Sequence, residues 1–235
     1  MGIFYLNPFL IAAAVLPAFF LLVRINRADK VEKEPRGLLV MLVIFGAVST
    51  AAASIAERVG IFALSLFISG DSLLYNAILY FVIVGLAEEF SKYFFLKRRT
   101  WNDPAFNYSF DAVVYAVYIA LGFAIWENLI YVFSYGLGTA LIRAVTAIPG
   151  HACFGVFMGV WYGEAKKREN LGDIAGSKTY RSAAVIMPAL LHGCYDFAAS
   201  LESRGYMWIF IVFVAILFIT AFRLVKKTSA EDQSI

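Results

Sequence analysis

Seven apolar runs, each about long enough to cross a membrane, constrain this chain of 235 residues more than any other feature. A helix needs roughly 20 residues to cross a hydrocarbon core of about 30 Å. Backbone N–H and C=O groups find no water at that depth, so each spanning segment must satisfy them within a helix. We therefore predict an all-α, polytopic membrane protein with about seven transmembrane helices, over residues 8–23, 38–56, 73–96, 112–135, 139–162, 182–201 and 207–225.

The composition supports the same fold class. Hydrophobic residues make up 61% of the chain and charged residues only 16%, whereas soluble domains are about 25% charged. No polar segment is long enough to fold separately, so residues 1–227 are predicted to form one domain. The short tail, 228–235, is expected to be disordered. The formal net charge is only +3 and no basic block is interleaved with aromatic residues, which argues against a nucleic-acid partner.

Basic residues are distributed unevenly between the two sides of the predicted bundle. The first, third and fifth loops and the C-terminal end hold 16 Lys and Arg residues, whereas the opposite loops hold Arg58 and Arg204, with Arg143 just inside a helix end. Because cytoplasmic loops are enriched in basic residues, we predict an N-out/C-in topology with a cytoplasmic tail. No Lys or Arg precedes the first run and several follow it, so this run is expected to be a retained helix rather than a signal peptide.

Seven ionisable side chains lie well inside the predicted spans, and both histidines of the chain are among them. A charge near the bilayer centre costs roughly 2.5–3.5 kcal/mol on insertion scales, so such residues are usually paired and functional. The four middle helices from the third to the sixth contribute the whole set, and the helices at the two ends contribute none. The residues are Glu88, Glu89, Lys92, Glu127, His151, His192 and Asp196.

Spacing along the helices indicates how these groups are arranged. Glu88 and Lys92 are four residues apart and share a helix face, so Lys92 is predicted to balance Glu88. Glu89 lies about 100° further round the helix and is predicted to be the less compensated carboxylate. His192 and Asp196 have the same four-residue spacing, which allows Asp196 to accept a ring proton from His192 and fix its tautomer.

Glu127 begins a second polar patch, on the fourth predicted helix. Tyr131 follows it by four residues on the same face, and Asn128 is a candidate hydrogen-bond donor. At about 1.5 Å per residue, the candidate groups are spread over different depths, so a kink or a displaced helix must bring them together. Pro149, two residues before His151, is a candidate for that kink.

The two cysteines each follow a histidine by two residues, as His151-x-Cys153 and His192-x-Cys194. Residues two apart on a helix point to opposite faces, so one helix cannot easily offer both side chains to the same metal ion. We therefore interpret Cys153 and Cys194 as buried small residues. The glycines at 155, 159 and 163 are interpreted as a stripe that lets another helix approach closely.

Carboxylates and imidazoles in a dry cavity suit peptide hydrolysis, which needs a base for water and donors for the developing oxyanion. The sequence has no Gly-x-Ser-x-Gly elbow, no Gly-x-Gly-Asp motif and no His-Glu-x-x-His motif. The same groups could serve a proton-coupled membrane transporter, although the sequence has neither an inverted repeat nor paired broken helices. A binding or scaffold protein without catalytic activity is a third alternative.

The order of the motifs along the chain resembles one protein family. Glu88-Glu89-x-x-Lys92, Glu127-Asn128-x-x-Tyr131, His151 and His192-x-x-x-Asp196 stand on successive predicted helices, as in the PrsW family of membrane proteases. That family is similar to the wider group of CAAX prenyl endopeptidases and bacteriocin-processing enzymes, the CPBP superfamily. The resemblance covers about residues 73–201, which we take as the predicted catalytic core.

The resemblance implies a multi-pass endopeptidase of the bacterial cell membrane that cleaves a single-span protein such as an anti-sigma factor. This cut would be the first, site-1-type step of regulated proteolysis. Glu88 or Glu89 would activate water, with a preference for Glu89, while His151 and His192 would bind water or stabilise the oxyanion. Two mechanisms stay open, one without a cofactor and one with a divalent metal such as zinc on Glu88, Glu89, His151 and His192. No oligomeric state is predicted.

Overall fold

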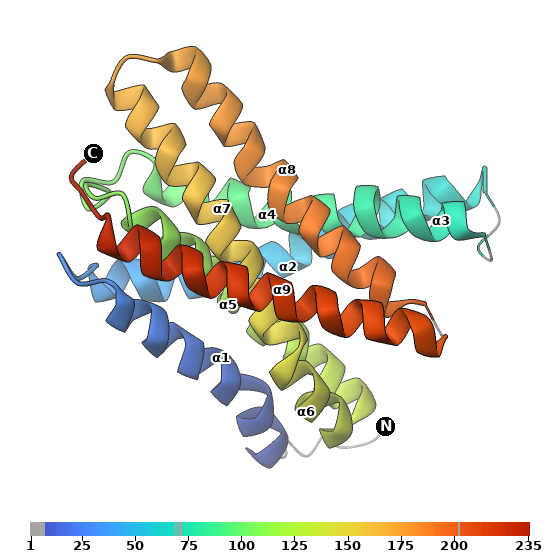
Figure 1. The fold of residues 1–235 in the computed structure, drawn as a ribbon. Coiled ribbons are helices and arrows are strands. Elements are labelled where there is room, and N and C mark those ends of the chain that lie inside the picture. Colours follow the sequence, from blue (N-terminus) through green and yellow to red (C-terminus); the bar gives the residue numbers. More distant parts are fainter. Residues whose placement is uncertain (1–7, 69, 71, 202) are drawn as a thin grey trace.

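The computed structural model describes residues 8–68, 70, 72–201 and 203–235 (Figure 1). Over this part of the chain the structure is helical and forms no strand. Seven segments are long and apolar enough to cross a membrane, which confirms the predicted all-α class. The elements are α1 (Pro8–Ala28), α2 (Arg36–Ser65), α3 (Leu73–Ile78), a π-helical segment (Leu79–Val84), α4 (Gly85–Thr100), α5 (Asp111–Tyr135), α6 (Leu137–Val145), α7 (Ala147–Asn170), α8 (Ile174–Ala199) and α9 (Arg204–Ala230).

Helix α5 lies at the centre of the bundle, and its residues from 111 to 124 are all buried. It packs against α1, α2 and α7, and α7 packs in turn against α8. Figure 1 shows α9 crossing in front of α5 and α7, with the hairpin of α7 and α8 projecting at one end. The central helix therefore carries Glu127 and Asn128 into the interior, where neighbouring helices surround them.

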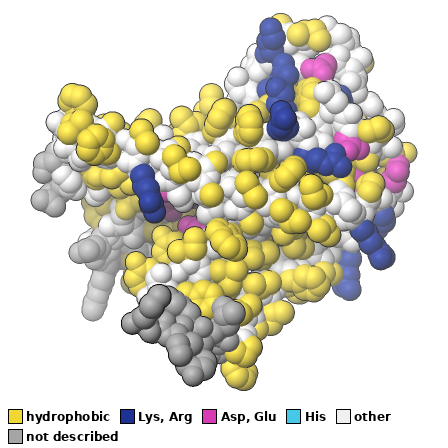
Figure 2. All heavy atoms as spheres, turned by 180° about the vertical axis from the view of Figure 1, so that it is seen from behind, with side chains coloured by type: hydrophobic (Ala, Val, Ile, Leu, Met, Phe, Trp, Pro, Cys, Tyr) yellow, Lys and Arg dark blue, Asp and Glu magenta, His cyan; other side chains and the backbone are white. Residues whose placement is uncertain are grey.

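The outer surface is apolar, as a lipid-facing surface must be. Helices α1, α2 and α9 expose large side chains such as Phe20, Phe62 and Phe222. Figure 2 shows hydrophobic side chains over the middle of one face, with most of the visible Lys and Arg toward one edge. This distribution suits a protein immersed in a lipid bilayer, whose charged loops lie outside the hydrocarbon core.

The glycine stripe of α7 is a packing feature, as predicted. A Cβ atom at Gly159 would lie 2.5 Å from the Cα of Val113 in α5, and one at Gly155 would lie 2.9 Å from the carbonyl oxygen of Ala116. No real Cβ fits at such distances, so α5 and α7 approach closely only because these positions are glycine. The same approach brings the end of α5 that carries Glu127 next to the start of α7.

The predicted helix over 139–162 is interrupted at Thr146. This residue has φ −120° and ψ −73°, outside the helical region, and separates α6 from α7. Pro149 lies in the first turn of α7, where a proline costs no helical hydrogen bond because the first N–H groups of a helix have no partner. The break places His151 near the start of α7 and gives α6 its own direction.

The C-terminal tail is ordered, so the expected disorder of residues 228–235 is wrong. Helix α9 continues to Ala230, and beyond it Asp232 accepts hydrogen bonds from the Phe110 N–H at 2.8 Å and the Ser109 hydroxyl at 3.0 Å. The N–H of Ile235 donates to the carbonyl oxygen of Asn107 at 2.9 Å. The loop before α5 therefore anchors the tail. These hydrogen bonds join residues more than a hundred positions apart in the sequence, so composition does not reveal them.

Candidate active site

Three charged side chains enter the bundle interior from the start of α4. Glu88, Glu89 and Lys92 lie in its first turns and are all buried. Just before them α4 approaches α8 closely, since a Cβ at Gly85 would lie 2.7 Å from the carbonyl oxygen of Ala189. The π-helical segment directly precedes this point, and such segments shift the register of a helix and are frequent at functional sites. The close approach places the three charges beside α8.

Lys92 lies at the centre of the cluster and is fully buried. Its Nζ lies 2.7 Å from Glu89 Oε1, 3.3 Å from Glu88 Oε2 and 3.2 Å from His151 Nδ1. It also lies 4.0 Å from the centroid of the Phe123 ring. The prediction that Glu89 is the less compensated acid is therefore wrong. A lysine side chain reaches carboxylates three and four residues earlier alike, so helical angles alone do not rank them.

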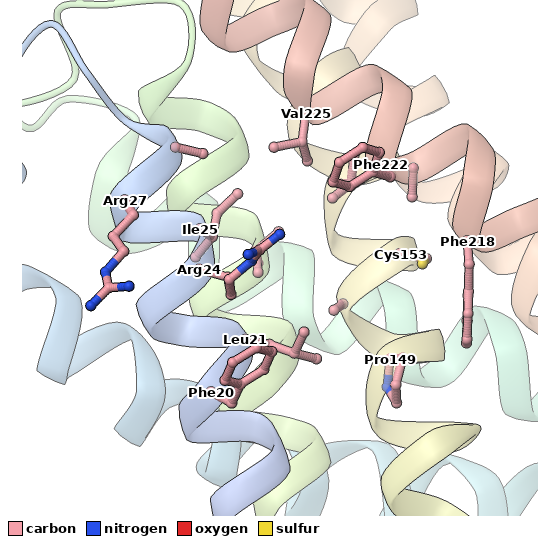
Figure 3. A pocket seen from close by; sticks show the side chains of 15 residues that line it. Phe20, Leu21, Arg24, Ile25, Arg27, Pro149, Cys153, Phe218, Phe222 and Val225 are labelled. Carbon is pink, nitrogen blue, oxygen red and sulfur yellow. The ribbon is translucent and has the colours of Figure 1, made fainter.

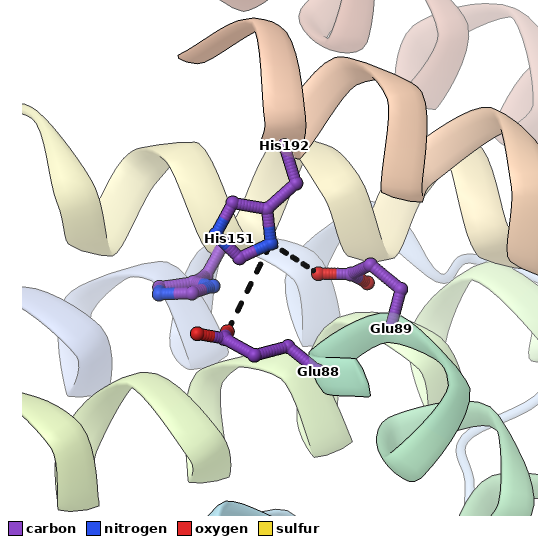
Figure 4. A group of neighbouring side chains, drawn as sticks. All are labelled: Glu88, Glu89, His151 and His192. Carbon is purple, nitrogen blue, oxygen red and sulfur yellow. Dashed lines mark hydrogen bonds and ion pairs between the residues drawn. The ribbon is translucent and has the colours of Figure 1, made fainter. Parts of the chain in front are cut away.

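His192 of α8 is held by carboxylates at both ring nitrogens. Its Nδ1 lies 2.9 Å from Glu89 Oε1 and 3.8 Å from Glu88 Oε2 (Figure 4). Its Nε2 lies 3.4 Å from Asp196 Oδ2, at the neighbouring position that the four-residue spacing predicts. The Phe154 ring stacks on the imidazole with a centroid distance of 4.7 Å. These contacts fix the orientation of the ring.

His151 of α7 has a matching arrangement. Its Nε2 lies 2.8 Å from Glu127 Oε2, while its Nδ1 faces the Lys92 ammonium. Because an ammonium only donates, Nδ1 accepts, and Nε2 carries the proton that is donated to Glu127. Each histidine therefore has a carboxylate at Nε2 and turns Nδ1 toward α4. Carboxylate partners of this kind orient the histidines of metal and catalytic sites.

Arg143 of α6 belongs to the site, although its place in the sequence predicts only a position at a helix end. Its Nη2 donates to Glu127 Oε2 at 2.8 Å, and its Nε donates to Asn128 Oδ1 at 2.9 Å. Asn128 in turn donates to the carbonyl oxygen of Ala14 at 3.0 Å. The guanidinium carbon lies 4.1 Å from the centroid of the Tyr131 ring. Asn128 and Tyr131 therefore reach the site through Arg143, whose signal in the sequence was an isolated basic residue at a span boundary.

Glu57 of α2 is a second residue that the sequence does not single out, because the predicted helix ends at residue 56. Helix α2 continues to Ser65, so Glu57 lies inside the span. Its partly exposed carboxylate interacts electrostatically with Glu127 and His192. Helix α2 therefore adds a further acid to the edge of the site.

Four residues of the cluster each offer one ligand atom, and these atoms all lie within 4.8 Å of one another: Glu88, Glu89, His151 and His192 (Figure 4). Carboxylate oxygens and imidazole nitrogens are ligands of zinc. Glu89 Oε2 is buried and has no hydrogen-bond partner among the residues that the structure describes. A buried oxygen of this kind requires a partner, so the donor set fits a divalent metal ion. Cys153 and Cys194 are free thiols outside this set.

Comparisons with known proteins agree with this geometry. The family described as PrsW family intramembrane metalloprotease matches residues 34–222. Protease PrsW of Halalkalibacterium halodurans is 28% identical over 225 residues, which are 95% of this chain and 99% of that protein. Protease PrsW of Oceanobacillus iheyensis is 31% identical over 220 residues, 94% of this chain and 96% of that protein. Protease PrsW of Clostridioides difficile is 31% identical over 208 residues, which are 87% of this chain and 84% of that protein.

No solved structure gives a significant match. The family match covers all the helices that carry the cluster, from α4 to α8, and it favours a protease over a proton-coupled transporter. The relatives are bacterial proteins, and seven segments of this chain are able to span a membrane. This chain therefore belongs to the PrsW family and is a membrane-embedded protease, a multi-pass protein of the bacterial membrane.

Proposed function

We propose that the chain is an endopeptidase that hydrolyses a peptide bond of a single-span membrane protein, such as an anti-sigma factor. The observation that carries the proposal is the convergence of Glu88, Glu89, His151 and His192, whose ligand atoms lie within 4.8 Å of one another. These residues come from α4, α7 and α8, so only the folded bundle assembles them. Hydrolysis inside a membrane needs such a polar centre, because the surrounding hydrocarbon supplies neither base nor water.

Glu88 is the better placed of the two acids to act as general base. Glu89 Oε1 lies 2.7 Å from Lys92 Nζ and 2.9 Å from His192 Nδ1, so it holds two donors. Lys92 lies further from Glu88, at 3.3 Å, and the Glu88 side chain is 8% exposed whereas that of Glu89 is not exposed at all. A carboxylate in close contact with an ammonium and an imidazole is less available to take a proton. We therefore assign water activation to Glu88, in place of Glu89, and an anchoring role to Glu89.

The hydrolytic step follows from this assignment. Glu88 takes a proton from water while the water oxygen attacks the carbonyl carbon of the substrate. The carbon–nitrogen bond then breaks, and the proton passes from Glu88 to the leaving amine. His151 and His192 hold the water, in orientations that Glu127 and Asp196 fix from the far side of each ring.

In the alternative mechanism with a metal, Glu88, Glu89, His151 and His192 would hold zinc, and Glu88 would then be a ligand rather than the general base. When bound, zinc lowers the pKa of a coordinated water and polarises a carbonyl group. Glu127 and Asp196 then have the usual task of carboxylates behind ligating histidines, which is to set the ring orientation and tautomer.

A small apolar cavity lies between α2 and the start of α4. Its volume is about 320 Å³, and it is lined in part by Gly60, Ile83 and Ala87. Ala87 directly precedes Glu88 in the sequence, so this cavity lies beside the turn of α4 that carries the proposed base. We assign it as the entrance for the transmembrane helix of the substrate.

The test is cleavage of a purified single-span anti-sigma factor by the purified full-length chain in liposomes. We expect a cut within or at the outer end of the substrate helix, identified by mass spectrometry, and it should not depend on a proton gradient. The metal content of the protein and the effect of a chelator distinguish the mechanism with a divalent metal from the mechanism without a cofactor. Loss of cleavage with the chelator, and its recovery when zinc is added back, would favour the metal mechanism. Gradient-dependent proton flux without cleavage would contradict the proposal and favour transport.

A further inference from the structure

A second cavity lies on the face of α7 that points away from His151, between α1 and α9 (Figure 3). Its volume is about 690 Å³. Helix α7 forms its floor with Pro149, Ala152, Cys153 and Val156, which recur at the spacing of one helix face. None of these residues contributes to the proposed hydrolytic step, so the cavity is separate from the active site.

The walls of the cavity are almost entirely apolar. Helix α1 contributes Phe20 and Leu21, and α9 contributes Phe218, Phe222 and Val225. A concave apolar surface that opens sideways within a bilayer is unfavourable for water, so hydrocarbon fills it. The volume lies within the range of about 300–1,000 Å³ that is usual for sites that bind small molecules and cofactors. An acyl chain is therefore the fitting occupant of the apolar part.

One end of the cavity is basic. Arg24 and Arg27 belong to its lining, and Figure 3 shows Arg24 extending from α1 into the space between α1 and α9. Arg24 has no ion-pair partner among the residues that the structure describes. It precedes the end of α1 by four residues, about 6 Å along the axis, which places the guanidinium close to the membrane interface.

The surroundings do not neutralise this end. Asp29, just beyond α1, and Glu34 are only 1% and 5% exposed, so both are turned into the protein. Exposed basic residues continue at the same end of α9, namely Arg223, Lys226 and Lys227. Basic groups at this depth attract the phosphate of anionic lipids, and each contributes separately to the attraction.

We infer that this cavity binds an anionic phospholipid, with one acyl chain between α1 and α9 and its phosphate beside Arg24. The lipid belongs to the leaflet that faces the basic loops. It packs behind the helix that carries His151, so it supports α7 from the side opposite the hydrolytic centre. This binding site is independent of the proposed proteolytic function and is tested without substrate.

Native mass spectrometry of the full-length chain, released from nanodiscs that contain phosphatidylglycerol or only phosphatidylcholine, measures the retained lipid. We expect the protein to retain more phosphatidylglycerol than phosphatidylcholine. In Arg24→Gln the retained phosphatidylglycerol should fall about fivefold, which corresponds to the contribution of one basic residue at an anionic membrane surface. Arg24→Lys should retain most of the binding. Arg58→Gln is the matched control, because Arg58 is an exposed arginine that does not line the cavity.

Equal retention of phosphatidylglycerol by Arg24→Gln and the unchanged protein would overturn the inference, as would equal retention of the two lipids. Photo-crosslinking from position 222 gives a second readout that does not depend on the arginine. Crosslinks to acyl chains support the inference. Crosslinks to protein that exclude lipid would overturn it and assign the cavity to a protein partner.

Discussion

Glu89 Oε1 lies 2.9 Å from His192 Nδ1, and this contact joins α4 to α8 at the centre of the site. The same oxygen lies 2.7 Å from Lys92 Nζ. One carboxylate therefore holds an imidazole and an ammonium together in the membrane interior. Because Glu89 is occupied in this way, we propose that its neighbour Glu88, whose contacts with Lys92 and His192 are longer, is the acid that acts on water.

Removal of the Lys92 charge should destabilise the bundle. We expect Lys92→Met to cost about 3–5 kcal/mol of unfolding free energy, because two buried carboxylates lose their counter-charge. Unfolding in detergent measures the loss, and Lys178→Met, at an exposed position, is the control. Adding Glu89→Gln to Lys92→Met should recover part of the stability. If the double variant is no more stable than Lys92→Met, the two residues do not stabilise each other.

The close approach of α4 and α8 should be needed for activity. Gly85→Ala forces the two helices apart, since the new Cβ would lie 2.7 Å from the carbonyl oxygen of Ala189. A displacement of about 1 Å at a catalytic group costs roughly 100-fold, so we expect a loss of that order in kcat/KM. Gly37→Ala is the matched control, because no atom lies within 4 Å of its added Cβ. Unchanged cleavage by Gly85→Ala would show that this contact does not position the site.

Glu127 should act by orienting His151 rather than by contacting the substrate. Glu127→Gln is expected to lower kcat by about 10- to 100-fold, the usual effect of removing such a carboxylate partner. The kcat of Arg143→Lys should lie between that of the unchanged protein and that of Glu127→Gln. A lysine cannot contact Glu127 and Asn128 at once, as the guanidinium of Arg143 does. Steady-state kinetics on a fluorogenic transmembrane peptide separates kcat from KM. A change in KM alone would assign Glu127 to substrate binding.

The loop between α1 and α2 should make stability depend on pH. Burial raises the pKa of Glu34 from 4.5 to about 9. Folded protein therefore keeps a proton on Glu34 that the unfolded chain has already released, so stability falls as the pH rises from about 5 toward 9. Burial also raises the pKa of Asp29, but only to about 6, so the change above about pH 7 reports Glu34.

Thermal unfolding at several pH values tests this expectation. In Glu34→Gln the side chain stays neutral, so the decline between about pH 7 and 9 should flatten. Glu32→Gln should retain the decline, because Glu32 is exposed. A decline of the same size in Glu34→Gln would assign the pH dependence to another group.

Much of this architecture can be predicted from the sequence. Hydropathy alone finds seven spans, because length and apolarity are what a bilayer requires. The cost of burying charge then selects residues such as Glu88, His151 and His192, and the structure brings these three together. Four-residue spacing also predicts that Asp196 lies beside His192.

The remaining features depend on contacts between distant segments. The interruption at Thr146 and the inward turn of Arg143 depend on how α6 packs on α5. Hydropathy does not place Glu57 in the membrane-spanning part of α2, because a charged residue near the end of an apolar run is typical of the start of a loop. Lys92 contacts Glu88 as the four-residue spacing predicts, at 3.3 Å, but it lies closer to Glu89, at 2.7 Å. Helical angles do not give this order, because a long lysine side chain reaches both carboxylates and also contacts His151 Nδ1.

The most direct test of the central claim compares Glu88→Gln with Glu89→Gln in the liposome cleavage assay. We predict that Glu88→Gln abolishes the chemical step, with a loss of about 100- to 10,000-fold in kcat, because a general base is removed. Its unfolding should stay close to that of the unchanged protein, whereas Glu89→Gln should lose stability as well as activity. Full activity in both variants, measured on protein of confirmed fold, would contradict the account.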